Sequence, residues 1–364
     1  MIETSAGLLI VTAPVFPPCA KPAPEKPPPA SLSPPSTRVK AGSRVSFVNI
    51  SSYLAVVVLQ ASASDFECIG LGPDFEIRSV DGTDRPALLS ALAEAHAILI
   101  RSATQVDAEA IAAARQLKVV ARAGVGLDNV DIKAATEAGV MVVNAPTSNI
   151  ISAAELTVGH ILSLARHIPA AHASLAAGEW KRSKFTGVEL YEKTLGIIGL
   201  GNLGRRVVRI AEGFQMQVLI CARPGSQEVP DGRVPLDTLL EKSDVISLHC
   251  PLSDATKNLI GKAQLQQMKS DAILINTARG GIVNENDLAA ALRQGEIGGA
   301  GIDVLTEEPP DASHPLLAPD IPNLLVSPHN AWGSIQSRQR LADEIADLIQ
   351  SYRSGAPRNC CQPG

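Results

Sequence analysis

The chain has 364 residues, of which 45% are hydrophobic and 19% are charged, and its formal net charge is −5. This composition is typical of a globular protein with a large core and enough chain for two domains. The net negative charge argues against a basic surface that would bind nucleic acid, so we expect no nucleic-acid partner. No apolar run is long enough to span a bilayer, so we expect no membrane partner. No C-x-x-C spacing occurs among the six cysteines, which are Cys19, Cys68, Cys221, Cys250, Cys360 and Cys361. We therefore expect free thiols, with no disulfide framework, no zinc site and no other metal.

Residues 1–46 differ from the rest of the chain because prolines crowd residues 12–40, as in KPAPEKPPPASLSPPS. Proline fixes φ and lacks a backbone donor, so we predict a disordered tail of polyproline character. The tail has no basic region of the kind that opens a secretory signal. We therefore expect a cytoplasmic protein. Targeting of the protein to an organelle by this tail is the alternative that stays open.

Apolar strands alternate with helical segments from about Ser46 onward, the pattern of a parallel sheet with helices on both faces. The first set of expected strands is VVVLQA (56–61), FEIRSV (75–80), AILIRS (97–102), KVVARAG (118–124) and VMVVNAP (140–146). A long helix should follow, capped by Ser152 with Glu155 reaching back to it. We expect this helix to bend near Pro169 and to stop before Gly178.

Residues 194–223 read as an apolar strand, a glycine turn, an amphipathic helix and a second apolar strand. The turn has the spacing G-x-G-x-x-G: Gly199 permits the tight bend, Gly201 lets backbone approach a pyrophosphate, and Gly204 lets the helix pack closely on the strand. The helix N-terminus would then face the anion. A glycine turn used only for packing is the less favoured interpretation.

The second strand of this segment ends at Arg223, where NAD-binding units carry a carboxylate for the ribose hydroxyls. A guanidinium at this position can hold the 2′-phosphate of NADP. The alternative is a solvated Arg223, with the ribose held by backbone groups. The cofactor is therefore expected to be NAD or NADP.

The second set of expected strands continues with QVLIC, DVISLHC (244–250), AILINTA (272–278), GAGIDV (299–304) and LLVSPH (324–329). Between them, a helix with Asn284 and Asp287 at capping positions should end at Gly295. A final helix is expected over about 334–354. Because it follows the completed dinucleotide unit, we expect it to pack on the first domain.

These elements predict an α/β protein with two Rossmann-like, doubly wound domains. The substrate domain would be discontinuous, with residues 47–151 and 332–359, and would be interrupted by a dinucleotide-binding domain over residues 152–331. A ligand cleft is expected between the two domains.

Three polar side chains follow strands of the second set, namely Arg279, Glu308 and His329. Ligands of open α/β sheets bind at the carboxyl ends of the strands, where these residues and a nicotinamide would meet. Taken singly, each has an ordinary structural explanation, but three at one edge favour catalysis. His329, oriented by Glu308, can give a proton to a carbonyl oxygen during hydride transfer, and Arg279 can hold a substrate carboxylate.

The motifs GLGNLG, HCPLSDATKNLIG, INTARGGIVNENDLAAAL, GAGIDVLTEEPP and SPH are similar to those of the D-isomer-specific 2-hydroxyacid dehydrogenases, and the resemblance covers residues 55–359. It implies catalytic roles for Arg279, Glu308 and His329, with Glu308 preferred to Glu307. It also implies an NAD cofactor, a small 2-keto or 2-hydroxy acid substrate, and a homodimer or higher homo-oligomer formed through the long helix after Ser152.

The same resemblance implies residues that contact the two ligands. Asp303 would hold the nicotinamide carboxamide, and the RAGVG loop would bind the substrate carboxylate. The implied cofactor contacts are Gly199, Gly201, Asn202, Leu203, Gly204, Cys250, Pro251, Thr277, Ala278 and Asp303, and the implied substrate contacts are Arg122, Gly124, Val125 and Gly126.

The run VDGTDRPALLSALAEAHAILIRSATQVDAEAI resembles D-3-phosphoglycerate dehydrogenases of serine biosynthesis, which implies that Arg101 is a phosphate ligand. The basic cluster Lys181, Arg182 and Lys184 either adds to phosphate binding or belongs to a solvated loop.

The later run SPHNAWGSIQSRQRL resembles glycerate dehydrogenases or hydroxypyruvate reductases, and Trp332 and Arg223 depart from the phosphoglycerate pattern. Our first hypothesis is thus oxidation of D-3-phosphoglycerate to 3-phosphohydroxypyruvate. The alternative is a glycerate dehydrogenase or hydroxypyruvate (glyoxylate) reductase. A function of another class, a dinucleotide-sensing binding protein like the C-terminal-binding-protein corepressors, stays open.

Overall fold

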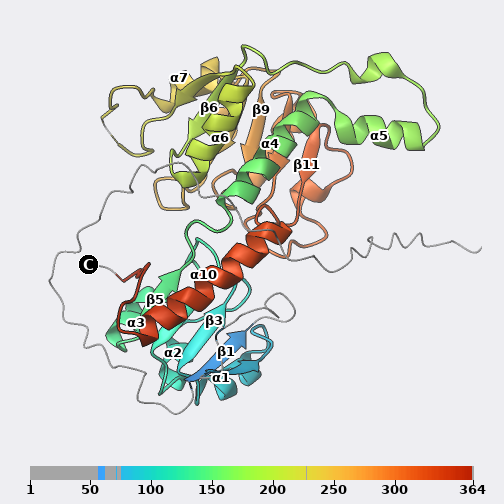
Figure 1. Cartoon of the computed structure of the whole chain (residues 1–364). Coiled ribbons are helices and arrows are strands. Elements are labelled where there is room, and N and C mark those ends of the chain that lie inside the picture. The colour runs from blue at the N-terminus through green and yellow to red at the C-terminus, as the bar shows by residue number, and fades with distance from the viewer. Residues whose placement is uncertain (1–55, 62–70, 72–74, 227, 363–364) are drawn as a thin grey trace, which may run out of the picture. The chain divides into compact units, whose positions relative to one another are not determined.

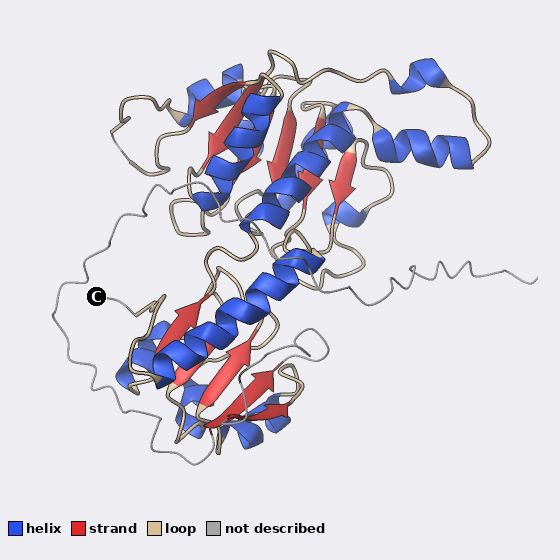
Figure 2. Ribbon diagram, viewed as in Figure 1, coloured by secondary structure: helices blue, strands red, loops and turns tan. Residues whose placement is uncertain are grey.

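The structure is a computed structural model that describes residues 56–61, 71, 75–226 and 228–362. The predicted proline-rich tail, Cys19 and Cys68 lie outside these residues. The described chain forms two sheets whose strands all run parallel, with helices packed against them (Figures 1 and 2). The predicted α/β class with two doubly wound units is confirmed.

The first sheet has the strand order β2-β1-β3-β4-β5. Its strands are β1 (Val56–Ala61), β2 (Phe75–Ser79), β3 (Ala97–Ile100), β4 (Val119–Arg122) and β5 (Met141–Asn144). The helices between them are α1 (Arg85–Leu92), α2 (Ala108–Ala113) and α3 (Ile132–Glu137). Each helix begins at an aspartate whose side chain accepts a hydrogen bond from the first turn, as a helix N-cap should.

Both faces of the first sheet are covered by apolar side chains. Ile98 lies in a core cluster with Leu88 of α1, whereas its neighbour Leu99 lies in another cluster with Ile345 of α10 (Ile335–Arg353). Successive side chains of a strand point to opposite faces, so one strand serves both clusters. The last helix of the chain therefore packs on the first sheet.

The second sheet has the order β11-β10-β9-β8-β6-β7, and an isolated parallel bridge between Cys221 and Val234 extends it beyond β7. The strands are β6 (Thr194–Ile198), β7 (Gln217–Ile220), β8 (Val245–Leu248), β9 (Ile273–Asn276), β10 (Gly299–Ile302) and β11 (Leu324–Val326). After β6 the chain passes to β7 on one side and then to β8 on the other. The strand order thus reverses at β6, and ligands bind at such a reversal.

Helices cover both faces of the second sheet. Ile197 of β6 packs with Val207 of α6 (Asn202–Gly213), and the next residue, Ile198, packs in the opposite cluster with Leu240 of α7 (Leu236–Lys242). α4 (Ile150–Ala165) and α6 lie side by side over one face (Figure 1). The remaining segments are α8 (Lys262–Gln267), α9 (Glu285–Gln294) and the short 3-10 helices Arg182–Phe185 and Pro315–Leu317.

The prediction of one bent helix beginning at Ser152 is wrong. The helix α4 (Ile150–Ala165) has Asn149 at its N-cap, and Ser152 lies buried inside it, with its Oγ 2.6 Å from that of Ser334. The chain turns at His167, whose φ is +51°, and α5 (Ile168–Ala176) then begins. Pro169 lies in the first turn of α5, where a missing N–H costs little, so it starts a new helix and does not bend the old one.

Other predicted helix ends are confirmed. Asn284 caps α9 by accepting from the backbone N–H of Asp287, and Gly295 ends the helix with a left-handed φ of +66°. Ser334 caps α10. Among the described residues, every helix is too short or too polar to cross a membrane.

Candidate active site

The glycine turn joins β6 to α6 with very little space around two of its residues. Gly199 has a φ of +102°, and a β-carbon there would lie 2.5 Å from the backbone nitrogen of Cys250. A β-carbon on Gly204 would lie 2.3 Å from the carbonyl oxygen of Gly199, so only glycine lets α6 approach β6 this closely. Around Gly201, by contrast, the position of a β-carbon is open space. The turn thus leaves its free side to a ligand at the N-terminus of α6.

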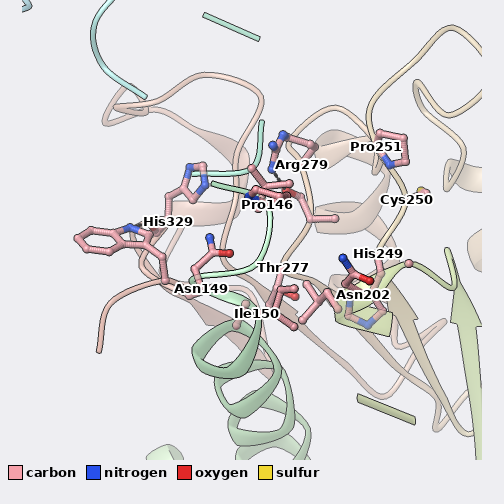
Figure 3. A pocket seen from close by; sticks show the side chains of 17 residues that line it. Pro146, Asn149, Ile150, Asn202, His249, Cys250, Pro251, Thr277, Arg279 and His329 are labelled. Atoms are coloured by element: carbon pink, nitrogen blue, oxygen red, sulfur yellow. Dashed lines mark hydrogen bonds between the residues drawn. The ribbon is translucent and has the colours of Figure 1, made fainter. Parts of the chain in front are cut away.

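A pocket of about 330 Å³, here called pocket A, opens beside this turn. It brings together residues that lie far apart in the sequence, with His329 on one side, Cys250 and Pro251 on the other, and Arg279 and Thr277 between them (Figure 3). The sequence-predicted residues that line it are Gly201, Asn202, Leu203, Cys250, Pro251, Thr277, Ala278, Arg279, His329 and Val125.

His329 and Glu308 form a hydrogen-bonded pair, with 2.6 Å between Nδ1 of the imidazole and a carboxylate oxygen. His329 follows β11 with a φ of +48°, and its backbone N–H donates to the carbonyl of Asp303 at 2.8 Å. The other oxygen of Glu308 accepts from the backbone N–H of Leu305 at 2.9 Å. The carboxylate is therefore fixed from both sides, and it can orient the ring and stabilise its protonated form.

The environment of Glu308 favours its ionised form. Burial alone would raise the pKa of this carboxyl, but the hydrogen bonds from His329 and Leu305 and the nearby charge of Arg279 outweigh burial and hold the pKa below its usual value. Glu308 does not line pocket A itself; it acts through His329.

Arg279 follows β9 and is held by two contacts. Its Nε lies 3.2 Å from a carboxylate oxygen of Asp128, and its Nη1 donates to the carbonyl of Ala278 at 2.7 Å. The backbone carbonyl of Arg279 accepts from the side chain of Asn276. Sequence reasoning missed Asp128 and Asn276, because both act by contacts that only the fold creates.

A smaller pocket of about 70 Å³, here called pocket B, adjoins pocket A. The two pockets share Val125, Asn149, Arg279, His329 and Trp332. Pocket B also contains the predicted substrate residues Arg101, Arg122, Gly124 and Gly126. Asn149, the N-cap of α4, was missed as a pocket residue, although a short polar residue before a helix is the signal of a cap.

Three arginines give pocket B a strong positive charge. Burial, together with the charges of Arg279 and Arg101 and against the opposing effect of Asp128, lowers the pKa of Arg122 to about 10. The Nε of Arg122 is buried and, within the described chain, has no hydrogen-bond partner. A buried donor without a partner is costly, so an anionic ligand here would relieve both the charge and the missing hydrogen bond.

A third pocket, here called pocket C, lies on the other side of the glycine turn and has a volume of about 690 Å³. Arg223 lines it at the end of β7, together with Arg233, whose Nη1 donates to the carbonyl of Cys221 at 3.0 Å. None of the described residues that line pocket C is an aspartate or a glutamate. Sequence reasoning missed Arg233, because only the parallel bridge at Val234 brings it beside Arg223.

Some predicted residues lie outside the pockets. Asp303 is 1% exposed, and its carboxylate accepts from the Ser327 hydroxyl and from the backbone N–H groups of Asn330 and Ala331. It therefore supports the loop that carries His329, and its contact with a carboxamide stays a prediction. The basic cluster Lys181, Arg182 and Lys184 lines a separate surface depression, where the two lysines pair with Glu179.

His249, which sequence reasoning also missed, lines pockets A and C beside the turn. Burial lowers its pKa to about 4, so its imidazole is neutral at pH 7. The four described cysteines, Cys221, Cys250, Cys360 and Cys361, are free thiols.

The family model described as D-isomer specific 2-hydroxyacid dehydrogenase, NAD binding domain, matches residues 158–331. The chain is 38% identical over 270 residues to the hydroxypyruvate reductase of Thermotoga maritima. The matched segment covers 73% of this chain and 87% of that protein. The chain belongs to the D-isomer specific 2-hydroxyacid dehydrogenase family. This assignment confirms the predicted family and a nicotinamide dinucleotide as its cofactor.

Further proteins are also similar to this chain. It is 42% identical over 306 residues to the D-3-phosphoglycerate dehydrogenase of Mycobacterium tuberculosis, covering 83% of this chain but only 57% of that longer protein. The chain thus spans little more than half the length of that relative. The structure of the acyclic imino acid reductase Bsp5 in complex with NADPH and D-Arg matches with a TM-score of 0.73 and 27% identity, over 84% of this chain and 100% of the other.

Proposed function

We propose that this member of the 2-hydroxyacid dehydrogenase family is an NAD(P)-dependent oxidoreductase that interconverts a small D-2-hydroxy acid and its 2-keto acid. One observation carries the proposal: the His329–Glu308 pair and Arg279 meet at the same pocket as the glycine turn. A proton donor, a carboxylate clamp and a dinucleotide cradle in one cavity are the parts that this reaction needs.

The residues divide the work of the reaction. When bound, the nicotinamide supplies or accepts the hydride at C2 of the substrate. His329 gives a proton to the C2 oxygen during reduction and takes it back during oxidation, while Glu308 stabilises the imidazolium. Arg279 and the backbone of Gly124–Gly126 hold the substrate carboxylate and polarise the carbonyl. The open space at Gly201 and the N-terminus of α6 fit the pyrophosphate.

D-3-phosphoglycerate is the substrate that we favour, with 3-phosphohydroxypyruvate as its product. The three arginines of pocket B support it, since a phosphate needs charge-assisted hydrogen bonds beyond those used by the carboxylate. The 42% identity to a D-3-phosphoglycerate dehydrogenase points the same way. D-glycerate and hydroxypyruvate are the second choice, supported by the small volume of pocket B and by the similarity to a hydroxypyruvate reductase.

NADP is the form of the cofactor that pocket C favours. Two guanidinium groups, Arg223 and Arg233, line this pocket, and the lining residues that the structure describes include no carboxylate to receive the ribose hydroxyls. A 2′-phosphate placed between two arginines gains charge-assisted hydrogen bonds, whereas a carboxylate would repel it.

The domain organisation and the assembly are further parts of the proposal. We assign residues 47–151 and 332–359 to the substrate domain and residues 152–331 to the dinucleotide domain, a division supported by the packing of α10 on the first sheet. Homodimerisation through α4 and α5 is supported by the apolar surface of α5, where Ile168 is 53% and Leu175 54% exposed. Sedimentation of the purified protein tests it, with a monomer as the contrary result. A cytoplasmic location stays a prediction.

Exchange of Arg101 tests the choice of substrate. If Arg101 binds the phosphate, Arg101→Ala lowers the ratio of kcat/KM for 3-phosphohydroxypyruvate over hydroxypyruvate by about 10- to 100-fold. Arg182→Ala serves as a matched control, because it removes the same charge from the surface depression outside pockets A and B. An unchanged ratio in Arg101→Ala would refute phosphate binding by Arg101. A loss in Arg182→Ala would assign the phosphate to the basic cluster.

A further inference from the structure

Trp332 contacts two of the proposed functional residues at once. Its indole N–H donates to the backbone carbonyl of His329 at 3.0 Å, and the guanidinium carbon of Arg101 lies 3.8 Å from the centre of its ring. Trp332 lines pocket A and pocket B, and so does His329, whereas Arg101 lines pocket B. The indole therefore stands between the acid–base residue and the arginine of the smaller pocket.

The turn that carries Trp332 is fixed on both sides. Before it, the backbone N–H of Ala331 donates to the carboxylate of Asp303. After it, Ser334 caps α10, and its hydroxyl lies 2.6 Å from the hydroxyl of Ser152 in α4. A ring on a turn held in this way is a firm platform for a flexible arginine.

Stacking determines how Arg101 meets a ligand. A guanidinium placed over an indole ring is attracted to it electrostatically, and the contact fixes the plane of the group. Because the N–H donors of a guanidinium lie in its plane, stacking on one face leaves its edge directed to oxygen atoms of a ligand in pocket B. The stacking contact reduces the side-chain entropy that Arg101 would lose on binding a ligand.

We propose that Trp332 is a positioning residue that sets the orientation of Arg101 and the backbone of His329 together, so that one side chain couples substrate selection to proton transfer. The inference rests on the proposed function only in that Arg101 binds the part of the 2-keto acid beyond C2. His329 has a left-handed φ of +48°, an uncommon conformation for a residue with a side chain, and the indole N–H contact helps to hold it.

Two substitutions separate the two contacts. Trp332→Phe keeps an aromatic face for Arg101 but removes the N–H donor, whereas Trp332→Leu removes both. For the 2-keto acid that the wild type reduces best, we expect Trp332→Leu to raise KM about tenfold and Trp332→Phe to raise it less than about threefold. Both variants should lower kcat, because both lose the hydrogen bond to His329. Equal KM values in the two variants would overturn the proposal.

A double variant tests the coupling directly. Adding Trp332→Leu to Arg101→Met should leave KM close to that of Arg101→Met alone, since the arginine that Trp332 positions is already gone. If the two effects on KM multiply, Trp332 does not act through Arg101 and the proposal is wrong.

Fluorescence gives a test that needs no substrate. The chain has two tryptophans, and Trp180 is 76% exposed, so Trp180→Phe leaves Trp332 as the sole tryptophan. In that background, Arg101→Met should change the emission of Trp332, while Arg182→Met should not. Unchanged emission in the Arg101→Met variant would overturn the stacking.

The outcomes for the substrate and for Trp332 remain distinct. If the wild type shows no preference for the phosphorylated keto acid, our choice of substrate fails, while the comparison of Trp332→Leu with Trp332→Phe still decides the role of the indole. If no keto acid is reduced, the proposed function fails. The emission of Trp332 then tests by itself whether the indole positions Arg101. Should Trp332→Leu fail to fold, the emission of the Arg101→Met variant remains decisive.

Discussion

The imidazole of His329 and the carboxylate of Glu308 lie 2.6 Å apart, and this pair sits at the pocket where the glycine turn ends. A second histidine–carboxylate pair, His314 with Glu285 at 3.0 Å, lies away from the three pockets described above. The molecule thus contains its own comparison between the pair that we propose for catalysis and a similar pair that lies outside these pockets.

His329→Ala should lower kcat by about two or more decades, because the C2 oxygen loses its proton donor. The affinity for the dinucleotide should stay close to that of the wild type. His314→Ala is the control: it removes the contact with Glu285 and should lower stability, but the folded fraction should keep its kcat. Steady-state rates of keto-acid reduction measure both variants. A near-wild-type kcat in His329→Ala would place the proton donor elsewhere.

Glu308→Gln should lower the rate of the reaction and change the pH dependence of stability. The carboxylate orients the imidazole of His329 through a hydrogen bond of 2.6 Å, so its removal should lower kcat. The pKa of Glu308 is lowered in the folded protein, so its contribution to stability is fully present above its ordinary value of 4.5 and is lost as the pH falls through the lowered value. Steady-state rates and urea unfolding at several pH values check both statements. An unchanged kcat in Glu308→Gln would contradict the first.

Alanine at two glycines of the turn should give opposite results. Gly201→Ala meets open space in the protein, so its melting temperature should stay unchanged while the Kd for the dinucleotide rises about tenfold or more. Gly204→Ala would press a β-carbon against the carbonyl of Gly199 and should destabilise the fold by about 1–3 kcal/mol. Calorimetry and nucleotide titration separate the two. A destabilised Gly201→Ala variant with intact binding would refute the proposed cradle.

Arg223→Asp should reverse the choice of nucleotide. A carboxylate at the end of β7 accepts the ribose hydroxyls of NAD and repels a 2′-phosphate, so the ratio of kcat/KM for NADPH over NADH should fall about 100-fold. Arg233→Ala should lower the same ratio by a smaller factor, because one arginine remains. Arg209→Asp, on the exposed surface of α6, makes the same change of charge as a control. An unaltered ratio in Arg223→Asp would show that this position does not select the cofactor.

Much of the fold follows from local rules that the sequence displays. The strands are short apolar runs buried on both faces, as β3 and β8 are, and such runs stand out from their polar surroundings. The glycine turn, the cap at Asn284 and the end of α9 at Gly295 are set by residues within a few positions of one another. In a parallel sheet the carboxyl ends of the strands lie at the same edge, so residues that follow the strands come close together. For this reason the sequence could place Arg279 and His329 in one pocket.

Features that depend on distant contacts could not be predicted in the same way. Ser152 looks like a cap, but it is held inside α4 by a contact with Ser334, far along the chain. Arg233 reaches pocket C only because Val234 bridges to Cys221, and Asp128 reaches Arg279 only through packing between distant loops. The stacking of Arg101 on Trp332 has no local signature either.

The rate of NADPH and NADH oxidation by the wild-type protein with 3-phosphohydroxypyruvate, hydroxypyruvate and glyoxylate tests the central claim most directly. We predict turnover that is fastest with NADPH and 3-phosphohydroxypyruvate, and a product of the D configuration. Faster turnover of hydroxypyruvate would select the second substrate. No turnover with any pair, while the dinucleotide still binds, would contradict the account and favour a dinucleotide-sensing binding protein.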